Sequence, residues 1–338
     1  MIYSSLMSRI KLAVLMAAAL ILPTGSLFSQ GTKEAPARRD LTFLYVPGVA
    51  DPFYYTMEKG AVEKAEELGI RLVVSEYPLV WDPAVQIPVL KEAAGREAFD
   101  LILIAPTAND ALIAPLKSLY EQGREIITVD TKIGDGDYSV ENGWSFPLSH
   151  IGTDNFAGGV RIAEYMAEQV REKGKVYINT TTRETSTTEE RKDGFVEGIS
   201  RFPDMEVVRI DYNGDIQTLA MKQTLKAMQE FPDLVGIFGS NVFSSQGVSA
   251  AVTNAGLSGA VRVAAWDATK ALVAGLRNGE IDLVLAQKPA EIGALAVEWG
   301  YRYFAEGKAV PEKITSGYVL LTQSNLNDPE MKQYVYSR

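Results

Sequence analysis

Short apolar runs alternate with longer amphipathic segments from residue 41 onward. Apolar runs of four to six residues predict buried strands, whereas apolar residues spaced three or four apart predict helices. In the segment 53–68, Met57, Ala61 and Ala65 share one helical face, and Gly69 supplies a stop signal. The pattern predicts strands at 41–46, 71–74, 101–104, 125–129, 149–152, 175–179, 205–210, 234–238, 261–265 and 282–286.

Amphipathic segments lie between most of these strands. They predict helices at 53–68, 84–95, 109–122, 155–171, 187–201, 216–230, 243–256, 268–278 and 289–306. Apolar strands that alternate with helices predict parallel sheets with helices on both faces. The polar stretch 132–147 contains three glycines and interrupts this alternation, so we interpret it as a loop. The expected fold is α/β, with two Rossmann-like lobes.

The first 40 residues follow neither pattern. Arg9 and Lys11 precede an apolar run at 12–22, and small residues follow up to Ser29, which is the order found in a secretory signal peptide. The run is shorter than the ~20 residues that a membrane span requires. We expect a signal peptide over 1–29, a flexible leader over 30–40 and a periplasmic mature protein. An uncleaved signal anchor is the alternative.

Composition narrows the chemistry. The chain has no cysteine and one histidine, His150. Thiolate metal sites, cysteine nucleophiles and multi-histidine metal centres are therefore excluded, and a serine hydrolase would have to use His150. The counts of 33 Lys+Arg and 43 Asp+Glu give a net charge of −10, which disfavours a nucleic-acid partner. We expect no catalytic residue, no metal and no cofactor.

Polar and aromatic residues stand at the carboxyl ends of several predicted strands, where open α/β sheets bind ligands. Carboxylates and amides can each bond neighbouring hydroxyls, and aromatic rings cover the C–H faces of a sugar. The pattern predicts a site for a small neutral sugar or polyol. Asp51 and Asp130 could instead be helix N-caps, and Phe53 and Trp266 could be core residues. The residues at these ends are Asp51, Phe53, Tyr54, Asp130, Asn241, Trp266, Asp267 and Gln287.

The segment 51–61 (DPFYYTMEKGA) resembles the opening motif of periplasmic sugar-binding proteins, most of all the ribose-binding-protein-like members of the type I periplasmic-binding fold. The resemblance covers 41–321. It continues in order through 101–107, 127–130, 150–155, 190–195, 239–241, 265–267 and 285–287.

The resemblance implies two lobes joined by a three-strand hinge, with crossings near 153–154, 287–288 and Ser316. The N-terminal lobe would comprise 41–153 plus 288–315. The C-terminal lobe would comprise 154–287 plus 316–338.

The resemblance also implies roles for single residues. Asp51 and Asp130 would bond sugar hydroxyls, and Arg191 would donate to the ring or anomeric oxygen. Phe53 and Tyr54 would form one wall of the site. The polar ring and the opposite wall would be completed by Asn241, Asp267, Gln287 and Trp266.

Two positions depart from the family pattern and are possible ligand contacts. Thr131 stands where ribose binders usually carry arginine, and Asp215 stands where the family often carries an aromatic residue. These departures put ribose itself in doubt. Trp81 and Trp144 lie in loops and either reach the cleft or pack locally. His150 matches a structural position.

The resemblance implies an extracytoplasmic solute-binding protein that captures a monosaccharide or small polyol, closes by hinge motion and delivers it to an ABC-type permease as a monomer. The alternatives are a sensor for a chemoreceptor or sensor kinase, a binder of a non-sugar ligand, and a sugar-processing enzyme. No GxSxG, P-loop or GxGxxG motif supports the enzyme. A sugar-regulated repressor of the same fold would carry a helix-turn-helix where this chain has the predicted signal.

Overall fold

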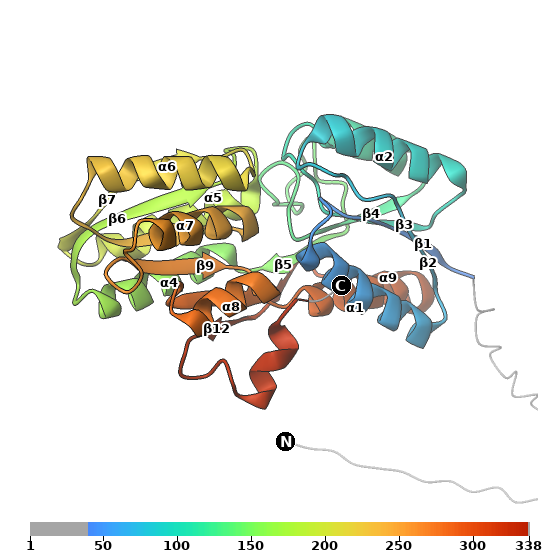
Figure 1. Cartoon of the computed structure of the whole chain (residues 1–338). Helices are drawn as coiled ribbons and strands as arrows, with labels where there is room; N and C mark the ends of the chain where they lie inside the picture. Colours follow the sequence, from blue (N-terminus) through green and yellow to red (C-terminus); the bar gives the residue numbers. More distant parts are fainter. Residues whose placement is uncertain (1–39, 337–338) are drawn as a thin grey trace, which may run out of the picture. The chain divides into compact units, whose positions relative to one another are not determined.

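The computed structural model describes residues 40–336. The predicted signal peptide, and the predicted leader except for Asp40, lie outside the described residues. Figure 1 shows two groups of strands flanked by helices, and each group is a six-stranded sheet. The predicted α/β fold with two Rossmann-like lobes is confirmed, and the predicted parallel pairing holds for all but one pair of strands. Within the described range, no helix combines the length and the apolar composition needed to cross a membrane.

The first sheet has the strand order β11-β5-β4-β3-β1-β2, with every pair parallel. Its strands are β1 (Thr42–Val46), β2 (Arg71–Val74), β3 (Leu101–Ile104), β4 (Glu125–Val129), β5 (Ser149–Thr153) and β11 (Lys313–Ser316). Helices α1 (Pro52–Leu68) and α9 (Pro289–Glu306) pack on one face. Helices α2 (Pro83–Arg96) and α3 (Ile113–Tyr120) pack on the other.

The second sheet has the order β12-β10-β9-β8-β6-β7, with only β12 antiparallel to its neighbour. Its strands are β6 (Lys173–Thr180), β7 (Asp204–Tyr212), β8 (Leu234–Gly239), β9 (Arg262–Trp266), β10 (Leu283–Gln287) and β12 (Tyr318–Leu321). Helices α4 (Asn155–Gln169) and α5 (Ser186–Ser200) cover one face. Helices α6 (Gln217–Glu230), α7 (Val242–Asn254) and α8 (Lys270–Asn278) cover the other.

Burial on both faces explains why the strands are continuously apolar. In β3, Leu101 and Leu103 contact the α1/α9 layer, whereas Ile102 and Ile104 contact the α2/α3 layer. All four are at most 1% exposed. Because neighbouring side chains of a strand point to opposite faces, a parallel strand between two helical layers needs an apolar residue at every position.

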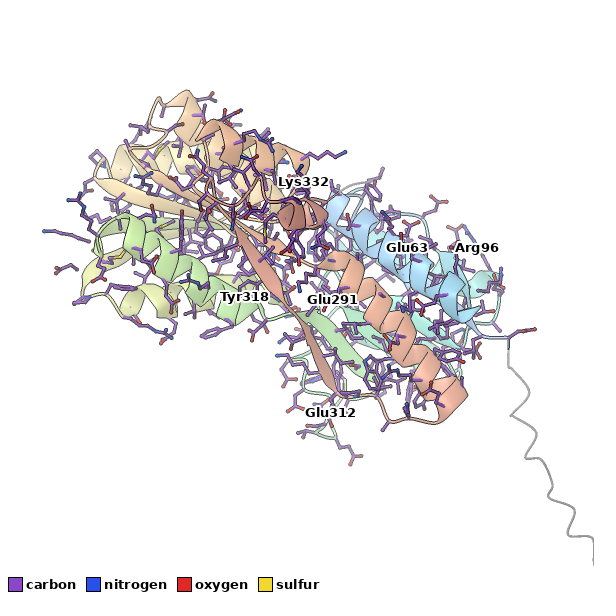
Figure 2. All side chains as sticks on the ribbon, turned by 90° about the horizontal axis from the view of Figure 1, so that it is seen from below. Glu63, Arg96, Glu291, Glu312, Tyr318 and Lys332 are labelled. Atoms are coloured by element: carbon purple, nitrogen blue, oxygen red, sulfur yellow. The ribbon has the colours of Figure 1, made fainter. Side chains whose placement is uncertain are left out.

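The chain passes between the two sheets three times. It leaves the first sheet at the end of β5 and enters α4, and it leaves the second sheet at the end of β10 and enters α9. The third passage joins β11 directly to β12, and Figure 2 shows this extended segment near Tyr318. Each sheet is therefore assembled from separate stretches of sequence.

Four elements differ from the expectation. The strands β11 and β12 are absent from the predicted set, because both are four-residue edge strands and β11 (KITS) contains polar residues. The 3-10 helix η1 (Pro329–Tyr334) was likewise not expected. The helix predicted at 109–122 begins only at Ile113. A helix that began at Asn109 would direct the Asn109 carbonyl to the Ile113 N–H, but this carbonyl accepts from the Gly134 N–H at 3.0 Å instead.

Helices α1 and α9 approach each other through glycines. A Cβ atom on Gly60 would lie 2.0 Å from the carbonyl oxygen of Ala290, and one on Gly293 would lie 2.1 Å from that of Met57. Backbone atoms cannot move aside as a flexible side chain can. The close contact of these two helices, which begin beside the carboxyl ends of β1 and β10, therefore requires glycine at both positions.

We predict that Gly60→Ala destabilises the protein by about 1–3 kcal/mol, because overpacking forces the two backbones apart. Thermal unfolding followed by circular dichroism would measure the change. Gly95→Ala in α2 is the matched control, since its Cβ would meet nothing within 4 Å, and it should raise stability by about 0.5–1 kcal/mol. Equal effects of the two variants would contradict the role of Gly60.

Candidate functional site

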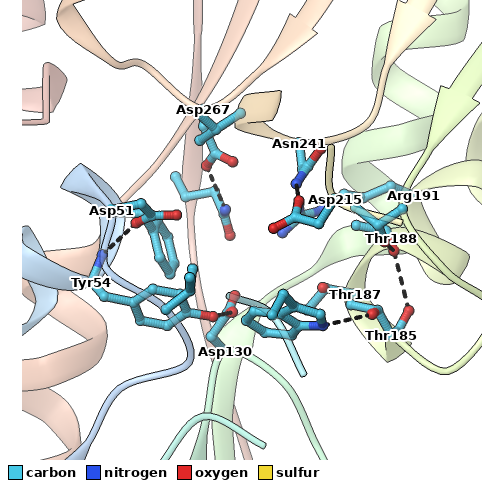
Figure 3. Close-up of a pocket in the computed structure, with 16 residues that line it drawn as sticks. Asp51, Tyr54, Asp130, Thr185, Thr187, Thr188, Arg191, Asp215, Asn241 and Asp267 are labelled. Carbon is cyan, nitrogen blue, oxygen red and sulfur yellow. Dashed lines mark hydrogen bonds between the residues drawn. The ribbon is translucent and has the colours of Figure 1, made fainter. Parts of the chain in front are cut away.

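A cavity lies where the carboxyl ends of strands from the two sheets face each other (Figure 3). Most of its lining residues follow a strand or begin a helix. The complete lining is Val49, Asp51, Phe53, Tyr54, Trp81, Asp130, Thr181, Thr185, Thr187, Thr188, Arg191, Asp215, Asn241, Val242, Asp267 and Gln287.

The first side of the cavity is built by the start of α1. Asp51 is the N-cap residue, and its side chain accepts a hydrogen bond from the Tyr54 backbone N–H at 3.1 Å. Pro52 occupies the first helical turn, where a missing N–H costs nothing. The helix start turns Tyr54 toward β4, and its hydroxyl donates to Asp130 Oδ2 at 2.7 Å. One cap therefore orients a carboxylate and an aromatic ring toward the same space.

Three of the cavity's aspartates adopt a left-handed backbone conformation. The φ angles are 61° for Asp130, 62° for Asp215 and 78° for Asp267. Asp tolerates this region better than most residues but still carries a conformational cost. The backbone N–H groups of Asp130 and Asp267 bond to Ile151 O and Leu285 O on the neighbouring strands. The chain thus keeps its sheet pairing up to the aspartate and then turns sharply.

The second side of the cavity is a set of paired polar groups. Asn241 caps α7 through its Oδ1, which accepts from the Ser244 N–H at 3.0 Å, and its Nδ2 donates to Asp215 Oδ1 at 2.6 Å. Gln287 Nε2 donates to Asp267 Oδ1 at 2.8 Å. Figure 3 shows Asp51, Asp130, Asp215 and Asp267 pointing toward a common centre.

Arg191 supplies the one cation of the cavity lining. It is 3% exposed and lies on the first turns of α5. Its Nε donates to Asn155 Oδ1 at 2.8 Å, and its Nη1 donates to Ser240 O at 3.0 Å. The guanidinium lies over the ring of Trp266 at 4.3 Å, a geometry that favours a buried cation. These contacts fix the plane of the guanidinium.

Burial raises the pKa values of the cavity's carboxylates more than the neighbouring donors and Arg191 lower them. Burial raises the pKa of Asp130 to about 6, although the charge of Arg191 and the bond from Tyr54 act to lower it. Burial also raises the pKa of Asp215 to about 6. The pKa values of Asp51 and Asp267 are raised for the same reason. Between residues 40 and 336, no group of three or more His, Asp or Glu residues is arranged to hold a metal ion.

Eight of the nine residues predicted for the site line the cavity, and so does Asp215, one of the two possible contacts. Trp266 does not. It is fully buried as the last residue of β9, where it packs on Phe238 and under Arg191. Thr131 is also buried outside the lining, with its hydroxyl donating to Pro106 O at 2.7 Å. Ligand contact by the eight residues remains a prediction.

The other candidates have local roles or reach the cavity. Trp81 lines it, with its ring stacked on Tyr54 at 6.2 Å between centroids. Trp144 packs in the 132–147 loop and donates to Asp135. His150 is buried, with its Nδ1 3.1 Å from Thr128 Oγ1, and burial lowers its pKa to about 3. A neutral, enclosed imidazole fits the structural position expected for it.

The sequence interpretation missed a threonine-rich contribution. The segment 180–188 contains six threonines, and four line the cavity: Thr181, Thr185, Thr187 and Thr188. Thr181 and Thr188 bond through their hydroxyls at 2.6 Å. A run of hydroxyl residues directly after a strand and before a helix is the signal that would have indicated this part of the site.

Direct bonds join the two sides of the cavity at one rim. Trp81 Nε1 donates to Thr185 Oγ1 at 3.0 Å, and Lys132 forms an ion pair with Glu190. The Lys132 N–H also donates to Ser186 Oγ at 3.3 Å. These rim contacts all converge on the segment 184–190, which enters α5. The two sides are therefore in direct contact at this rim.

Comparison with known proteins places this geometry in a family. A family model described as a periplasmic binding protein domain matches residues 43–309. Among curated proteins, the ribose import binding protein RbsB of Haemophilus influenzae is 27% identical over 82% of this chain and 89% of its own. The D-allose-binding periplasmic protein of Escherichia coli is 25% identical over 78% of this chain and 84% of its own.

A solved structure extends the likeness to three dimensions. It is an ABC transporter solute-binding protein from Agrobacterium vitis bound to α-D-tagatopyranose, with a TM-score of 0.85 and 36% identity. The alignment covers 88% of this chain and all of that one. Because the family model spans most of the chain and this relative is similar over its full length, the chain belongs to the periplasmic binding protein family.

Proposed function

We propose that this protein captures a monosaccharide or similar small polyol in the cavity and delivers it to an ABC-type permease. The observation that carries the proposal is the ring of polar side chains at the strand ends of both sheets. The functions and ligands of the relatives, namely ribose import, allose binding and bound tagatose, support a sugar as the cargo. The family consists of binding proteins for transport, so no turnover is required of these residues.

The cavity suits a ligand that brings many hydrogen-bond donors. Four carboxylates line the cavity, and one oxygen of each accepts a hydrogen bond from a protein donor. Asp130 Oδ1 and Gln287 Oε1 are buried and have no partner among the described residues. Since a buried acceptor without a donor is costly, these two atoms are where ligand hydroxyls would bond. Phe53, Tyr54 and Trp81 would cover the ring's apolar faces.

Arg191 and the threonines would supply the complementary donors. Nε and Nη1 of Arg191 are committed to protein acceptors, so Nη2 is the atom we expect to donate to a ring or anomeric oxygen. Arginine suits this role because its planar fork stays charged and donates in fixed directions. Trp266 would act by supporting Arg191 from below rather than by stacking on the ligand.

We also propose lobes formed by 41–153 with 288–315 and by 154–287 with 316–338, moving about the three passages between the sheets. A ligand bonded to residues of both lobes would favour the closed arrangement, because it gains contacts there that an open arrangement lacks. The rim contacts would belong to the same closed arrangement. The predicted signal peptide would place the protein in the periplasm as a monomer facing the permease.

We predict one-to-one binding of at least one sugar by isothermal titration calorimetry. The panel would contain D-tagatose, D-ribose, D-allose and D-arabinose, followed by inositols and small polyols. Tight binding with a preference among epimers is expected, because fixed polar partners reject a ligand that leaves one of them unpaired. Heat changes no larger than those of buffer for every compound would contradict the proposal.

We predict that Asp130→Asn weakens binding of the best ligand about 10–100-fold. The variant keeps the shape of the side chain but loses a charge-assisted acceptor, a change of about 1.5–3 kcal/mol. Asp110→Asn is the matched control, since Asp110 is exposed in the turn between β3 and α3 and does not line the cavity, and it should bind as the wild type does. Unchanged affinity in Asp130→Asn would remove Asp130 from the binding set.

We predict that stability and affinity depend on pH in opposite directions. The pKa of Asp215 is about 6 in the folded protein but about 4 in an unfolded chain. The native state therefore binds the proton more tightly, and the cost of ionising this group develops as pH rises from about 4 to about 6. Asp215→Asn should be about 1–3 kcal/mol more stable than the ligand-free wild type at pH 7.5, and nearly equal at pH 4.

The affinity of the wild type should instead fall as pH drops through about 6, because protonated Asp130 and Asp215 lose their charge-assisted acceptor role. Thermal melts and calorimetry over pH 4–8 measure both trends. A stability difference between wild type and Asp215→Asn that is constant with pH would count against the buried-carboxylate explanation.

We predict that Lys132→Ala weakens ligand binding about threefold and does so mainly by faster dissociation, because the ion pair with Glu190 joins the two sides of the rim and would be broken when the proposed lobes open. Stopped-flow fluorescence would measure both rate constants. Lys64→Ala removes a Glu67 pair on α1 away from the cavity and is the control. Equal dissociation rates in the two variants would show that the rim pair does not stabilise the closed form.

A further inference from the structure

The last described residues return to the base of the cavity. After β12 the chain forms η1 (Pro329–Tyr334) and then extends to Tyr336. The Tyr336 backbone N–H donates to Ala268 O at 2.8 Å, and the residue pairs with Thr269 as an isolated bridge. Its side chain is 1% exposed. This C-terminal segment thus delivers a tyrosine to the interior immediately beside Asp267.

The Tyr336 hydroxyl bonds to two groups of the site. It donates to Asp267 Oδ1 at 3.1 Å and accepts from the Gln287 backbone N–H at 2.9 Å. Gln287 Nε2 donates to the same Oδ1 at 2.8 Å. Both donors fall on Oδ1, so neither occupies Oδ2, and the backbone N–H of Val242 also bonds this carboxylate. Together with these donors the hydroxyl fixes the rotation of the carboxylate, and it anchors the backbone of the glutamine that shares Oδ1.

The amide of Gln287 is oriented by the same arrangement. Its Nε2 is committed to Asp267, whereas its Oε1 is buried without a partner in residues 40–336. Gln287 is 1% exposed and lines the cavity. An unpartnered acceptor at this depth is an atom that needs a donor from outside the protein. Without the Tyr336 hydroxyl, the Gln287 N–H would lose its partner and the amide would lose its anchor.

The ring of Tyr336 contacts the other side of the cavity. It meets the ring of Phe53 edge to face, at 5.8 Å between centroids and 63° between planes. Phe53 belongs to α1, which packs on the first sheet, whereas Asp267 and Gln287 end strands of the second. Tyr336 does not itself line the cavity. It can influence a ligand only through the residues that it holds.

We propose that Tyr336 is a positioning residue of the binding site, which holds Asp267 and Gln287 so that Asp267 Oδ2 and Gln287 Oε1 face the ligand. The proposal rests on the proposed function, since it concerns how that cavity binds a sugar. It gives a role in the binding machinery to Tyr336 alone, the residue that follows η1 and bonds to Asp267 and Gln287. A plain packing role would need the ring but not the hydroxyl, and this difference gives the test.

The test compares Tyr336→Phe with the wild type. The variant keeps the ring and its contact with Phe53 but removes both hydroxyl bonds. Calorimetry with D-tagatose, or with whichever sugar of the panel binds the wild type best, should show about a tenfold weaker affinity. Tyr334→Phe is the matched control in the same segment: this ring lies 5.8 Å from Lys288 Nζ and outside the cavity lining, so its loss of hydroxyl should leave affinity unchanged.

A second measurement needs no ligand. Burial raises the pKa of Asp267, and the neighbouring carboxylates of Asp51, Asp130 and Asp215 also oppose its ionisation. Arg191, Gln287 and the Val242 backbone N–H act to lower this pKa, and so does the Tyr336 hydroxyl. Losing this donor raises the pKa further, so the cost of ionising Asp267 grows with pH. Tyr336→Phe should melt several degrees below the wild type at pH 7.5 and closer to it at pH 4. Loss of packing alone would lower both melting temperatures equally.

The two measurements separate the two ideas. If the wild type binds no sugar, the proposed function fails, and the ligand-free pH series still decides the role of Tyr336. If the wild type binds and Tyr336→Phe binds equally well with a pH-independent melting difference, Tyr336 is a packing residue and the inference is wrong. Weaker binding together with the pH-dependent difference supports it. If Tyr336→Phe does not fold at pH 7.5 but folds at pH 4, the pH-dependent effect is also supported.

Discussion

Buried negative charge is the constraint around which the cavity is organised. Four aspartates line it against the single guanidinium of Arg191. Moving an ionised carboxylate from water into the protein interior raises its free energy, and hydrogen-bond donors offset only part of that cost. The surrounding contacts are those donors: the N-cap at α1, the hydroxyl of Tyr54, the amides of Asn241 and Gln287, and the hydroxyl of Tyr336. Much of the local structure can be understood as holding these charges at fixed angles.

The fold makes this concentration of charge possible. Parallel strands end at one edge of a sheet, and here two such edges face each other. That same rule let sequence alone predict Asp51, Asp130, Asn241, Asp267 and Gln287 as neighbours, since each stands at or just after a buried apolar run. Arg191 lies inside a helix start, where no strand-end rule applies, and its place followed only from resemblance to a family.

The misplaced residues have physical explanations. Trp266 was expected beyond the end of β9, but the strand includes it, and alternation along the strand turns it toward the layer formed by α4 and α5. Thr131 points at a backbone carbonyl instead of the cavity. Trp81 and Tyr336 reach the site from a loop and from a C-terminal segment. Such contributions depend on tertiary packing and leave no periodic signal in the sequence.

Backbone strain occurs at the same residues as the buried negative charge. Five described non-glycine residues have positive φ, and Asp130, Asp215 and Asp267 are three of them; the others, Arg171 and Glu172, follow the end of α4. Glycine, which tolerates positive φ, or a neutral side chain at these three positions would lower the free-energy cost of folding. Strain and uncompensated charge persist together when another requirement outweighs stability. Under the proposed function, the requirement in this cavity is a set of rigid acceptors in fixed directions that would match a molecule with several hydroxyls. The features that weaken the free protein are therefore those that would make its binding selective.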